Sequence, residues 1–340
     1  MEEFEELVCR YVGQSFGVAV SSGTAGLHLC IRALGIGPGD EVIVPSFTFV
    51  AAANAVRYEG ALPVFVDIED RCLNLDPERI EAAITPRTRA IIAVHTFGCP
   101  ADMAAILDIA HHHRLRVIED ACEAIGAMYQ GRQVGCFGDA TVFAFYPNKQ
   151  ITTGEGGVVI TGDSHLATEI RAMRNHGRYE SDEWHQHSIL GYNYRLSEIN
   201  CALGCAQMRR ISEILARREQ VARKYEALLR DLPDLVLPPT DIAEVRLSWF
   251  VYVVRLATDF SQEGRDAIAR MLHERGIGCG RYFAPIHSQP AYAEWPVRWP
   301  LAVTESVSRR TLALPFFTRL GDEDIEHVSL ALRESLAAAT

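Results

Sequence analysis

The chain has 340 residues, of which 48% are hydrophobic and 23% charged, and its formal net charge is −11. This composition supports a sizeable core and excludes an intrinsically disordered chain, and the length allows one large domain and a smaller one. An acidic chain is not expected to bind nucleic acid or an anionic membrane. The N-terminus lacks a basic region followed by an apolar one, and the apolar runs stay below the roughly 18 residues of a membrane span. We therefore expect a soluble, cytoplasmic protein.

The first two-thirds of the chain alternates strand-like and helix-like segments. The predicted strands are 17–20, 41–45, 62–66, 90–95, 116–118, 141–145 and 157–160. The predicted helices between them are a segment ending at Leu34, then 50–59, 77–84 and 101–113, with Asp76 as the N-cap before Pro77. Such alternation predicts an α/β fold, with a mostly parallel seven-stranded sheet between helices.

The last third of the chain has a different pattern. Residues 196–232 are rich in helix-forming residues and predict one long helix, and Leu237-Pro238-Pro239-Thr240 follows as a break. A strand over 247–256 and helices over 264–275 and 322–338 come after it. We therefore expect a large domain over 1–215, ending within the long helix, and a smaller α+β domain over 216–340.

Three features follow predicted strands, where ligands gather in open α/β sheets. Ser21-Ser22-Gly23-Thr24 leads into a helix and offers backbone amides to a phosphate. Asp120 ends the run Val117-Ile118-Glu119, and Lys149 stands between an aromatic strand and the Gly-rich stretch 152–157. Taken singly, the three features read as a capped turn, a turn acid and a surface lysine.

Together these features match the needs of pyridoxal phosphate (PLP) chemistry. A lysine forms a Schiff base with the cofactor's aldehyde, and an anionic carboxylate keeps its pyridine nitrogen protonated. Lys149 and Asp120 supply this pair of groups. The sequence therefore predicts a PLP-dependent aminotransferase.

Five segments resemble the sugar-nucleotide aminotransferases of the DegT/StrS type, in register over nearly the whole chain. They are 21–25, 40–51, 119–126, 143–157 and 190–198. The resemblance implies the aspartate-aminotransferase type of PLP fold (fold type I). It also implies a homodimer with active sites at the subunit interface.

The resemblance also implies roles for individual residues. Lys149 corresponds to the Schiff-base lysine and Asp120 to the partner of the pyridine nitrogen. The remaining cofactor positions are the phosphate-binding turn of Gly23, Thr24 and Ala25, the stacking aromatic Phe49, Glu123 near the phenolic oxygen, and Asn193, which binds the phosphate in the other subunit's site. Tyr282 and His287 fall where the family has residues on the substrate side.

One departure concerns the cofactor's phosphate. Many members carry a serine five positions before the lysine, where this chain has Ala144. We expect the phosphate to depend instead on the Gly23–Thr24 turn together with the partner's Asn193 or with Thr153.

The run Phe145-Tyr146-Pro147-Asn148-Lys149-Gln150, together with Glu123, is most similar to the perosamine-synthase-like branch. That branch implies transfer of an amino group from L-glutamate to C4 of a nucleotide-linked 4-keto-6-deoxy sugar, in amino-sugar biosynthesis. The residues leave open the nucleotide (GDP, UDP or dTDP) and amination at C3 rather than C4.

Two other functions fit the same scaffold less well. A PLP-dependent sugar dehydratase typically replaces the Schiff-base lysine by histidine, whereas this chain keeps Lys149. A non-catalytic, sugar-nucleotide-binding dimer would have no need of both Lys149 and Asp120. No metal site is expected, because the adjacent residues of His111-His112-His113 point in different directions on a helix.

Overall fold

The computed structural model describes residues 1–339, and its centre is a seven-stranded sheet in the order β1-β9-β8-β5-β4-β2-β3. The strands are β1 (Phe16–Val20), β2 (Glu41–Pro45), β3 (Leu62–Val66), β4 (Thr88–Val94), β5 (Arg116–Asp120), β8 (Ala140–Ala144) and β9 (Gly157–Thr161). The neighbours from β8 to β3 pair in parallel, while β9 is antiparallel to both β1 and β8. The prediction of an α/β fold with a mainly parallel sheet of seven strands is confirmed.

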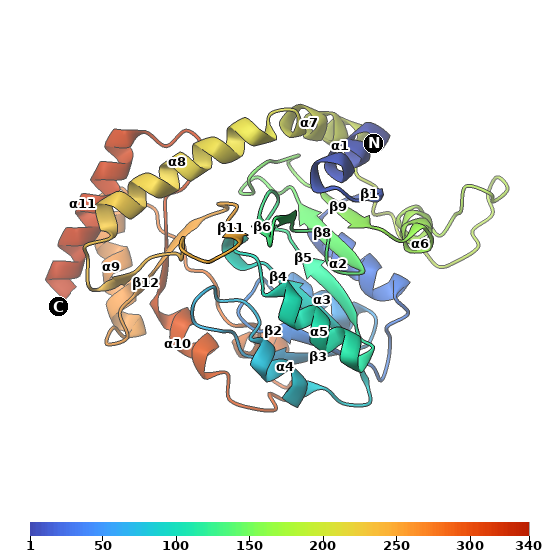
Figure 1. Ribbon diagram of the computed structural model, residues 1–340, viewed down its shortest axis with the longest axis horizontal. Coiled ribbons are helices and arrows are strands. Elements are labelled where there is room, and N and C mark those ends of the chain that lie inside the picture. Colours follow the sequence, from blue (N-terminus) through green and yellow to red (C-terminus); the bar gives the residue numbers. More distant parts are fainter. Residues whose placement is uncertain (340) are drawn as a thin grey trace.

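Helices cover both faces of this sheet (Figure 1). Because strand side chains alternate, Val18 and Val20 of β1 join one apolar cluster and Ala19 joins another. The face of Val18 and Val20 is packed by α2 (Gly23–Ala33), α3 (Ala51–Tyr58) and α6 (Ser164–Arg174). The opposite face is packed by α1 (Glu2–Val12), α4 (Pro77–Ala83), α5 (Met103–His113) and α7 (Glu198–Met208).

A separate apolar cluster, which we call the small core, lies in the C-terminal part of the chain. It contains residues of α8 (Ile211–Leu229), α9 (Gln262–Glu274), α11 (Asp322–Ala339), β10 (Leu235–Val236), β12 (Tyr252–Leu256) and β13 (Thr311–Leu314). The strands form a sheet in the order β10-β12-β13, and α10 (Ala302–Arg310) lies beside it.

Helix α8 joins the two cores and runs along the upper edge of Figure 1. Its first turn contributes Ile211 and Ile214 to the core under the large sheet, and from Val221 onward it contributes to the small core. The predicted boundary between residues 215 and 216 falls inside this helix, and the division into two domains stays a prediction.

Short elements complete the fold. β11 (Val245–Arg246), β6 (Met128–Tyr129) and β7 (Arg132–Gln133) form a third small sheet, and three 3₁₀ turns span Thr96–Gly98, Ile286–Ser288 and Pro290–Tyr292. Within residues 1–339 we find no helix with the length and apolar character required to cross a membrane.

The prediction of one helix over 196–232 is wrong. The chain forms α7 and α8, with Arg210 in a non-helical conformation between them. The break lets α7 bury Cys201, Cys205 and Met208 beside α1 while α8 takes a new direction toward the small core. No Gly or Pro marks the break, so tertiary packing here overrides local helix propensity.

The strand predicted over 247–256 is also shorter than expected, because β12 begins only at Tyr252. The preceding residues are held by other parts of the chain: Ser248 donates its backbone N–H to the carbonyl of Gly98 (3.0 Å), and Arg218 binds the carbonyls of Trp249 and Phe250. The other predicted elements are present, with ends that differ by one or two residues. Helices α6 and α10, strand β13 and the two-residue strands were not predicted.

Candidate active site

A cavity of about 460 Å³ opens where the parallel strands end and helix α2 begins. Val94, Asp120 and Ala144 line it from the ends of β4, β5 and β8. The predicted site residues that line this cavity are Gly23, Thr24, Phe49, Asp120, Glu123, Lys149 and Tyr282. The fold thus brings together residues that lie far apart in the sequence.

The start of α2 forms an anion-binding turn. Ser22 is the N-cap, and its Oγ accepts a hydrogen bond from the amide of Ala25 (3.1 Å). The amides of Gly23 and Thr24, in the first turn, have no acceptor within the helix and lie at its positive end, which suits a phosphate. Ala25 itself does not line the cavity.

Gly23 is the residue that the packing of this turn requires. A Cβ atom placed there would lie 2.8 Å from the Sγ of Cys122 and 2.9 Å from the Cβ of Ala144. Both distances are shorter than van der Waals contact. Any side chain at position 23 would therefore displace the wall of the cavity.

Asp120 ends strand β5 and is 7% exposed. Its Oδ1 accepts a hydrogen bond from the amide of Cys122 (3.2 Å), and its backbone carbonyl accepts one from the amide of His95 (3.1 Å). The first contact fixes the direction of the carboxylate, and the second fixes the backbone at the end of β5.

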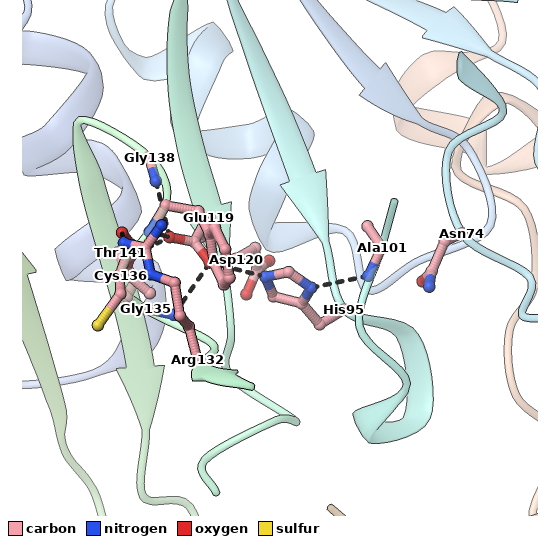
Figure 2. Close-up of polar contacts among 12 residues, drawn as sticks. Asn74, His95, Ala101, Glu119, Asp120, Arg132, Gly135, Cys136, Gly138 and Thr141 are labelled. Carbon is pink, nitrogen blue, oxygen red and sulfur yellow. Dashed lines mark hydrogen bonds and ion pairs between the residues drawn. The ribbon is translucent and has the colours of Figure 1, made fainter. Parts of the chain in front are cut away.

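The residue before it, Glu119, is fully buried on the other side of the strand (Figure 2). Its carboxylate accepts five hydrogen bonds, from His95 Nε2 (3.2 Å), the amides of Gly135 (3.0 Å), Phe137 (2.9 Å) and Gly138 (2.8 Å), and Thr141 Oγ1 (2.9 Å). Burial alone would raise the pKa of Glu119, but the hydrogen bonds from His95, Gly138 and Gly135 lower it overall. This buried anion holds the end of β5, and hence Asp120, in place.

Lys149 reaches the cavity from the loop after β8. Its Nζ lies 3.4 Å from Glu123 Oε1 and 4.1 Å from the centre of the Phe250 ring. Glu123 is fixed through its other oxygen, which accepts a hydrogen bond from the amide of Phe97 (3.0 Å). Burial raises the pKa of Glu123, although Lys149 and the Phe97 amide oppose this effect.

Phe49 and Tyr282 lie on the walls of the cavity. Phe49 is 60% exposed, although it is a large apolar residue. Tyr282 packs edge-on against Phe97, Phe250 and Phe283.

Asn193 and His287 do not line the cavity. Asn193 is exposed in an extended segment that pairs with Asn175. His287 Nδ1 lies 2.7 Å from Ser46 Oγ, and its Nε2 lies 3.7 Å from Glu305, while burial lowers the pKa of this histidine. Thr153 does not line the cavity either, and its hydroxyl donates to the carbonyl of Glu155 (2.7 Å).

Sequence reasoning missed several residues of the site. Cys122, Tyr146 and Phe250 line the cavity, and Phe250 is the aromatic ring against the amine of Lys149. A further signal was available in the composition, because Lys149 and Lys224 are the two lysines of the whole chain. Among residues 1–339 we find no group of three His, Cys, Asp or Glu side chains placed to hold a metal.

The residues present fit PLP. Gly23 and Thr24 line the cavity at a helix N-terminus, which suits a phosphate, Asp120 offers a fixed carboxylate, and Lys149 offers an amine in the same cavity. A mainly parallel sheet between helices, with this set of groups at the carboxyl ends of its strands, defines a PLP-dependent transferase of fold type I.

Comparison with known proteins identifies the family. The DegT/DnrJ/EryC1/StrS aminotransferase family matches residues 1–333, and the chain belongs to this family. The family is PLP-dependent, so the protein is a PLP-dependent aminotransferase.

Two curated relatives are similar over almost the full chain. GDP-perosamine synthase of Caulobacter vibrioides is 43% identical over 334 residues, which cover 98% of this chain and 89% of the relative. A UDP-N-acetyl-3-dehydro-alpha-D-glucosamine 3-aminotransferase of Acidithiobacillus ferrooxidans is 42% identical, with 98% and 87% covered. The crystal structure of S. venezuelae DesV in complex with a ketimine intermediate is also similar, with a TM-score of 0.91, 39% identity, and 98% and 88% covered.

Proposed function

We propose that this protein transfers the amino group of L-glutamate to C4 of a nucleotide-linked 4-keto-6-deoxy sugar, in amino-sugar biosynthesis. The observation that carries the proposal is the meeting of Lys149, Asp120 and the Gly23–Thr24 turn in one cavity. The relatives at 43% and 42% identity support the substrate class, since both are named for nucleotide-linked sugars.

The cofactor would be held by residues already positioned in this chain. The amides of Gly23 and Thr24 would receive its phosphate, Asp120 would pair with its ring nitrogen, and Lys149 would bind its aldehyde carbon. When bound, PLP supplies an electron sink and carries the amino group between the two substrates.

The protein's own groups divide the remaining work. Asp120 would supply the carboxylate that keeps the ring nitrogen protonated, and the amide of Cys122 fixes its direction. Lys149 would accept and return the proton on the carbon that bears the amino group, because it is the one basic side chain among the described residues that line the cavity. Glu123 orients this amine through the 3.4 Å contact.

The position of amination is the finer part of the proposal. One close relative is named as a 3-aminotransferase and another as a perosamine synthase, at almost equal identity. The run from Phe145 to Gln150 and the glutamate at position 123 favour the perosamine-synthase-like branch and therefore C4.

We also propose that the protein acts as a homodimer in the cytoplasm, with a second copy closing the cavity. Phe49 and Tyr146 line the cavity yet are 60% and 51% exposed, and Leu190 and Ile199, on either side of Asn193, are 69% and 83% exposed. Exposed apolar residues grouped around a site mark a surface that a partner covers. The segment between α6 and α7 includes a loop that extends away from the sheet at the right of Figure 1, whereas Asn193 pairs with Asn175 at the end of α6.

The test is an assay of purified protein with L-glutamate and a panel of nucleotide-linked keto sugars. The panel pairs GDP, UDP and dTDP with 3-keto and 4-keto sugars, and formation of 2-oxoglutarate is followed. We expect turnover with a 4-keto sugar and an amino group at C4 in the product. Turnover of 3-keto sugars alone would move the reaction to C3, and loss of water without use of glutamate would identify a dehydratase.

A preliminary measurement addresses the non-catalytic alternative. Protein mixed with PLP is expected to show visible absorbance that glutamate changes. Protein that binds a nucleotide sugar but never acquires this absorbance would be a binding dimer.

A further inference from the structure

Arg218 of helix α8 is a buried cation whose partners are carbonyls, a hydroxyl and a ring. The residue is 4% exposed, and its Nε and one terminal nitrogen donate to the carbonyls of Trp249 (2.7 Å) and Phe250 (2.8 Å). The other terminal nitrogen donates to Thr318 Oγ1 (3.3 Å), and the guanidinium lies 5.1 Å from the centre of the Phe316 ring. Burial lowers the pKa of Arg218 to about 10. Burying a cation costs free energy of folding, so we asked what the hydrogen bonds of Arg218 contribute to the protein.

The carbonyls that Arg218 holds belong to the segment that touches the reactive amine. Phe250 is 1% exposed, and the centre of its ring lies 4.1 Å from Lys149 Nζ, within the range of a cation–π contact. Arg218 is therefore linked to the amine of Lys149 through a single residue, Phe250.

The same segment is fixed from its other side. Gln150, the neighbour of Lys149, donates its Nε2 to the carbonyl and to the Oγ of Ser248 (3.1 Å each). Ser248 Oγ in turn donates to the carbonyl of Ile125 (2.5 Å). Residues 248–250 thus bridge the loop of Lys149 and helix α8.

We propose that Arg218 is a positioning residue for Lys149, which keeps the Phe250 ring against the amine by holding the carbonyls of Trp249 and Phe250. Since α8 belongs to both cores, this contact links the packing of the small core to the environment of the amine. The proposal rests on Lys149 being the reacting amine of the proposed function.

The proposal predicts a change in the reactivity of Lys149 in the protein freed of cofactor. The electron-rich face of the ring attracts the ammonium form, whereas the neutral amine is the nucleophile. Phe250→Leu removes this attraction, so an amine reagent should label Lys149 about two- to thirty-fold faster near neutral pH. The other charged or titratable groups near the amine, Glu123, Asp120 and Cys122, are unchanged in all variants.

Arg218→Met should change the labelling in the same direction, because the ring is no longer held. In the double variant with Phe250→Leu, it should add little. If Arg218 acted instead as a charge through space, its removal would favour the ammonium form and slow the labelling, and this effect would persist in the double variant. Arg218→Lys, which can bind one carbonyl, should give an intermediate rate.

The experiment labels the full chain with a small amine reagent and quantifies Lys149 by peptide mapping. Lys224, whose side chain is 44% exposed and pairs with Asp322, serves as the internal reference amine. A second measurement at strongly alkaline pH corrects for access, because every amine is then neutral. A more open cavity would raise the labelling rate of Lys149 at both pH values, whereas loss of the Phe250 ring would raise it only near neutral pH.

Arg310→Met is the matched control. Arg310 is also buried and also binds a carbonyl, that of Leu256 (2.8 Å), but it does not touch the 248–250 segment. We expect Arg310→Met to lower the melting temperature and to leave the labelling of Lys149 unchanged.

Two outcomes would overturn the proposal. One is that Arg218→Met also leaves the labelling of Lys149 unchanged, and the other is that the effects of Arg218→Met and Phe250→Leu simply add in the double variant. If Arg218→Met does not fold, Arg218→Lys decides in the same way. None of these measurements needs a sugar substrate, so a failure of the proposed function would be seen separately.

Discussion

Lys149 Nζ lies 3.4 Å from Glu123 Oε1, and the other oxygen of Glu123 is held by the amide of Phe97 at 3.0 Å. The amine is thus directed into the cavity by a carboxylate that cannot itself turn away. Because burial raises the pKa of Glu123, this carboxylate depends on the nearby cation to stay charged. Lys149 and Glu123 are therefore already in contact before any ligand binds.

The first prediction concerns the amine. Lys149→Ala should abolish transamination, because the same group anchors the cofactor and carries the proton. Borohydride reduction of the cofactor-loaded protein, followed by peptide mapping, should place the cofactor on Lys149. Lys224 is the only other lysine, so Lys224→Arg is the matched control and should keep both activity and label. A label on Lys224, or on the terminal amine, would refute the assignment.

The second prediction concerns the charge at the end of β5. Asp120→Asn keeps the size of the side chain but removes the anion that maintains a protonated ring nitrogen. Turnover should fall by orders of magnitude, equivalent to a few kcal/mol of barrier. The melting temperature should change little, because the hydrogen bond from the Cys122 amide can still be accepted. Turnover near that of the unaltered protein would show that another group faces the nitrogen.

The third prediction concerns the turn at the start of α2. Gly23→Ala places a Cβ against Cys122 Sγ and Ala144 Cβ, at 2.8 and 2.9 Å, so the turn must shift. We expect weaker retention of PLP in equilibrium dialysis. Gly37→Ala is the control, because its Cβ would meet nothing closer than 3.8 Å. Equal retention in the two variants would show that the turn does not bind the phosphate.

A fourth prediction follows from the burial of His287. Burial lowers the pKa of this histidine below its usual value of 6.5, so the folded chain prefers the neutral ring. As the pH falls through the usual value, the unfolded chain takes up the proton first, and the folded state loses stability. The stability that the native protein has over His287→Gln should therefore shrink between neutral and mildly acidic pH. An advantage that grows with acidity, as measured by urea unfolding, would mean that the ion pair with Glu305 prevails.

The sequence predicted the position of a residue correctly where a single local segment determines the structure. Asp120 and Lys149 could be placed because apolar runs mark β5 and β8, and because parallel strands end at the same edge of a sheet. The break in the helix at Arg210 could not be predicted, because nothing in the local sequence disfavours a helix there.

The contacts of Phe250 and Arg218 could not be predicted from the sequence for a related reason. Phe250 was assigned to a strand by its apolar neighbours, but long-range bonds from Arg218 and Gln150 hold its segment out of the sheet. A charged residue on the apolar face of α8, between Ile214 and Val221, was the one sign that a buried contact exists there. Such a sign shows that a partner is needed without showing which one.

The last prediction concerns Asn193, which is exposed and does not line the cavity of its own chain. With Ala144 unable to donate a hydrogen bond, the phosphate should depend on a donor from the second subunit. A hydrogen bond to a charged group contributes about 1.5–3 kcal/mol. Asn193→Ala should therefore weaken PLP retention by about one to two powers of ten.

Mixing subunits decides where Asn193 acts. A dimer of one Lys149→Ala chain and one Asn193→Ala chain places both defects in one site, if each site takes its lysine and its asparagine from different chains. The other site is then intact, so mixing the two impaired proteins should restore part of the activity. Differently tagged chains allow the mixed dimers to be isolated before assay. If isolated mixed dimers show no recovery, Asn193 serves its own subunit, and a donor within the chain must hold the phosphate in place of the partner.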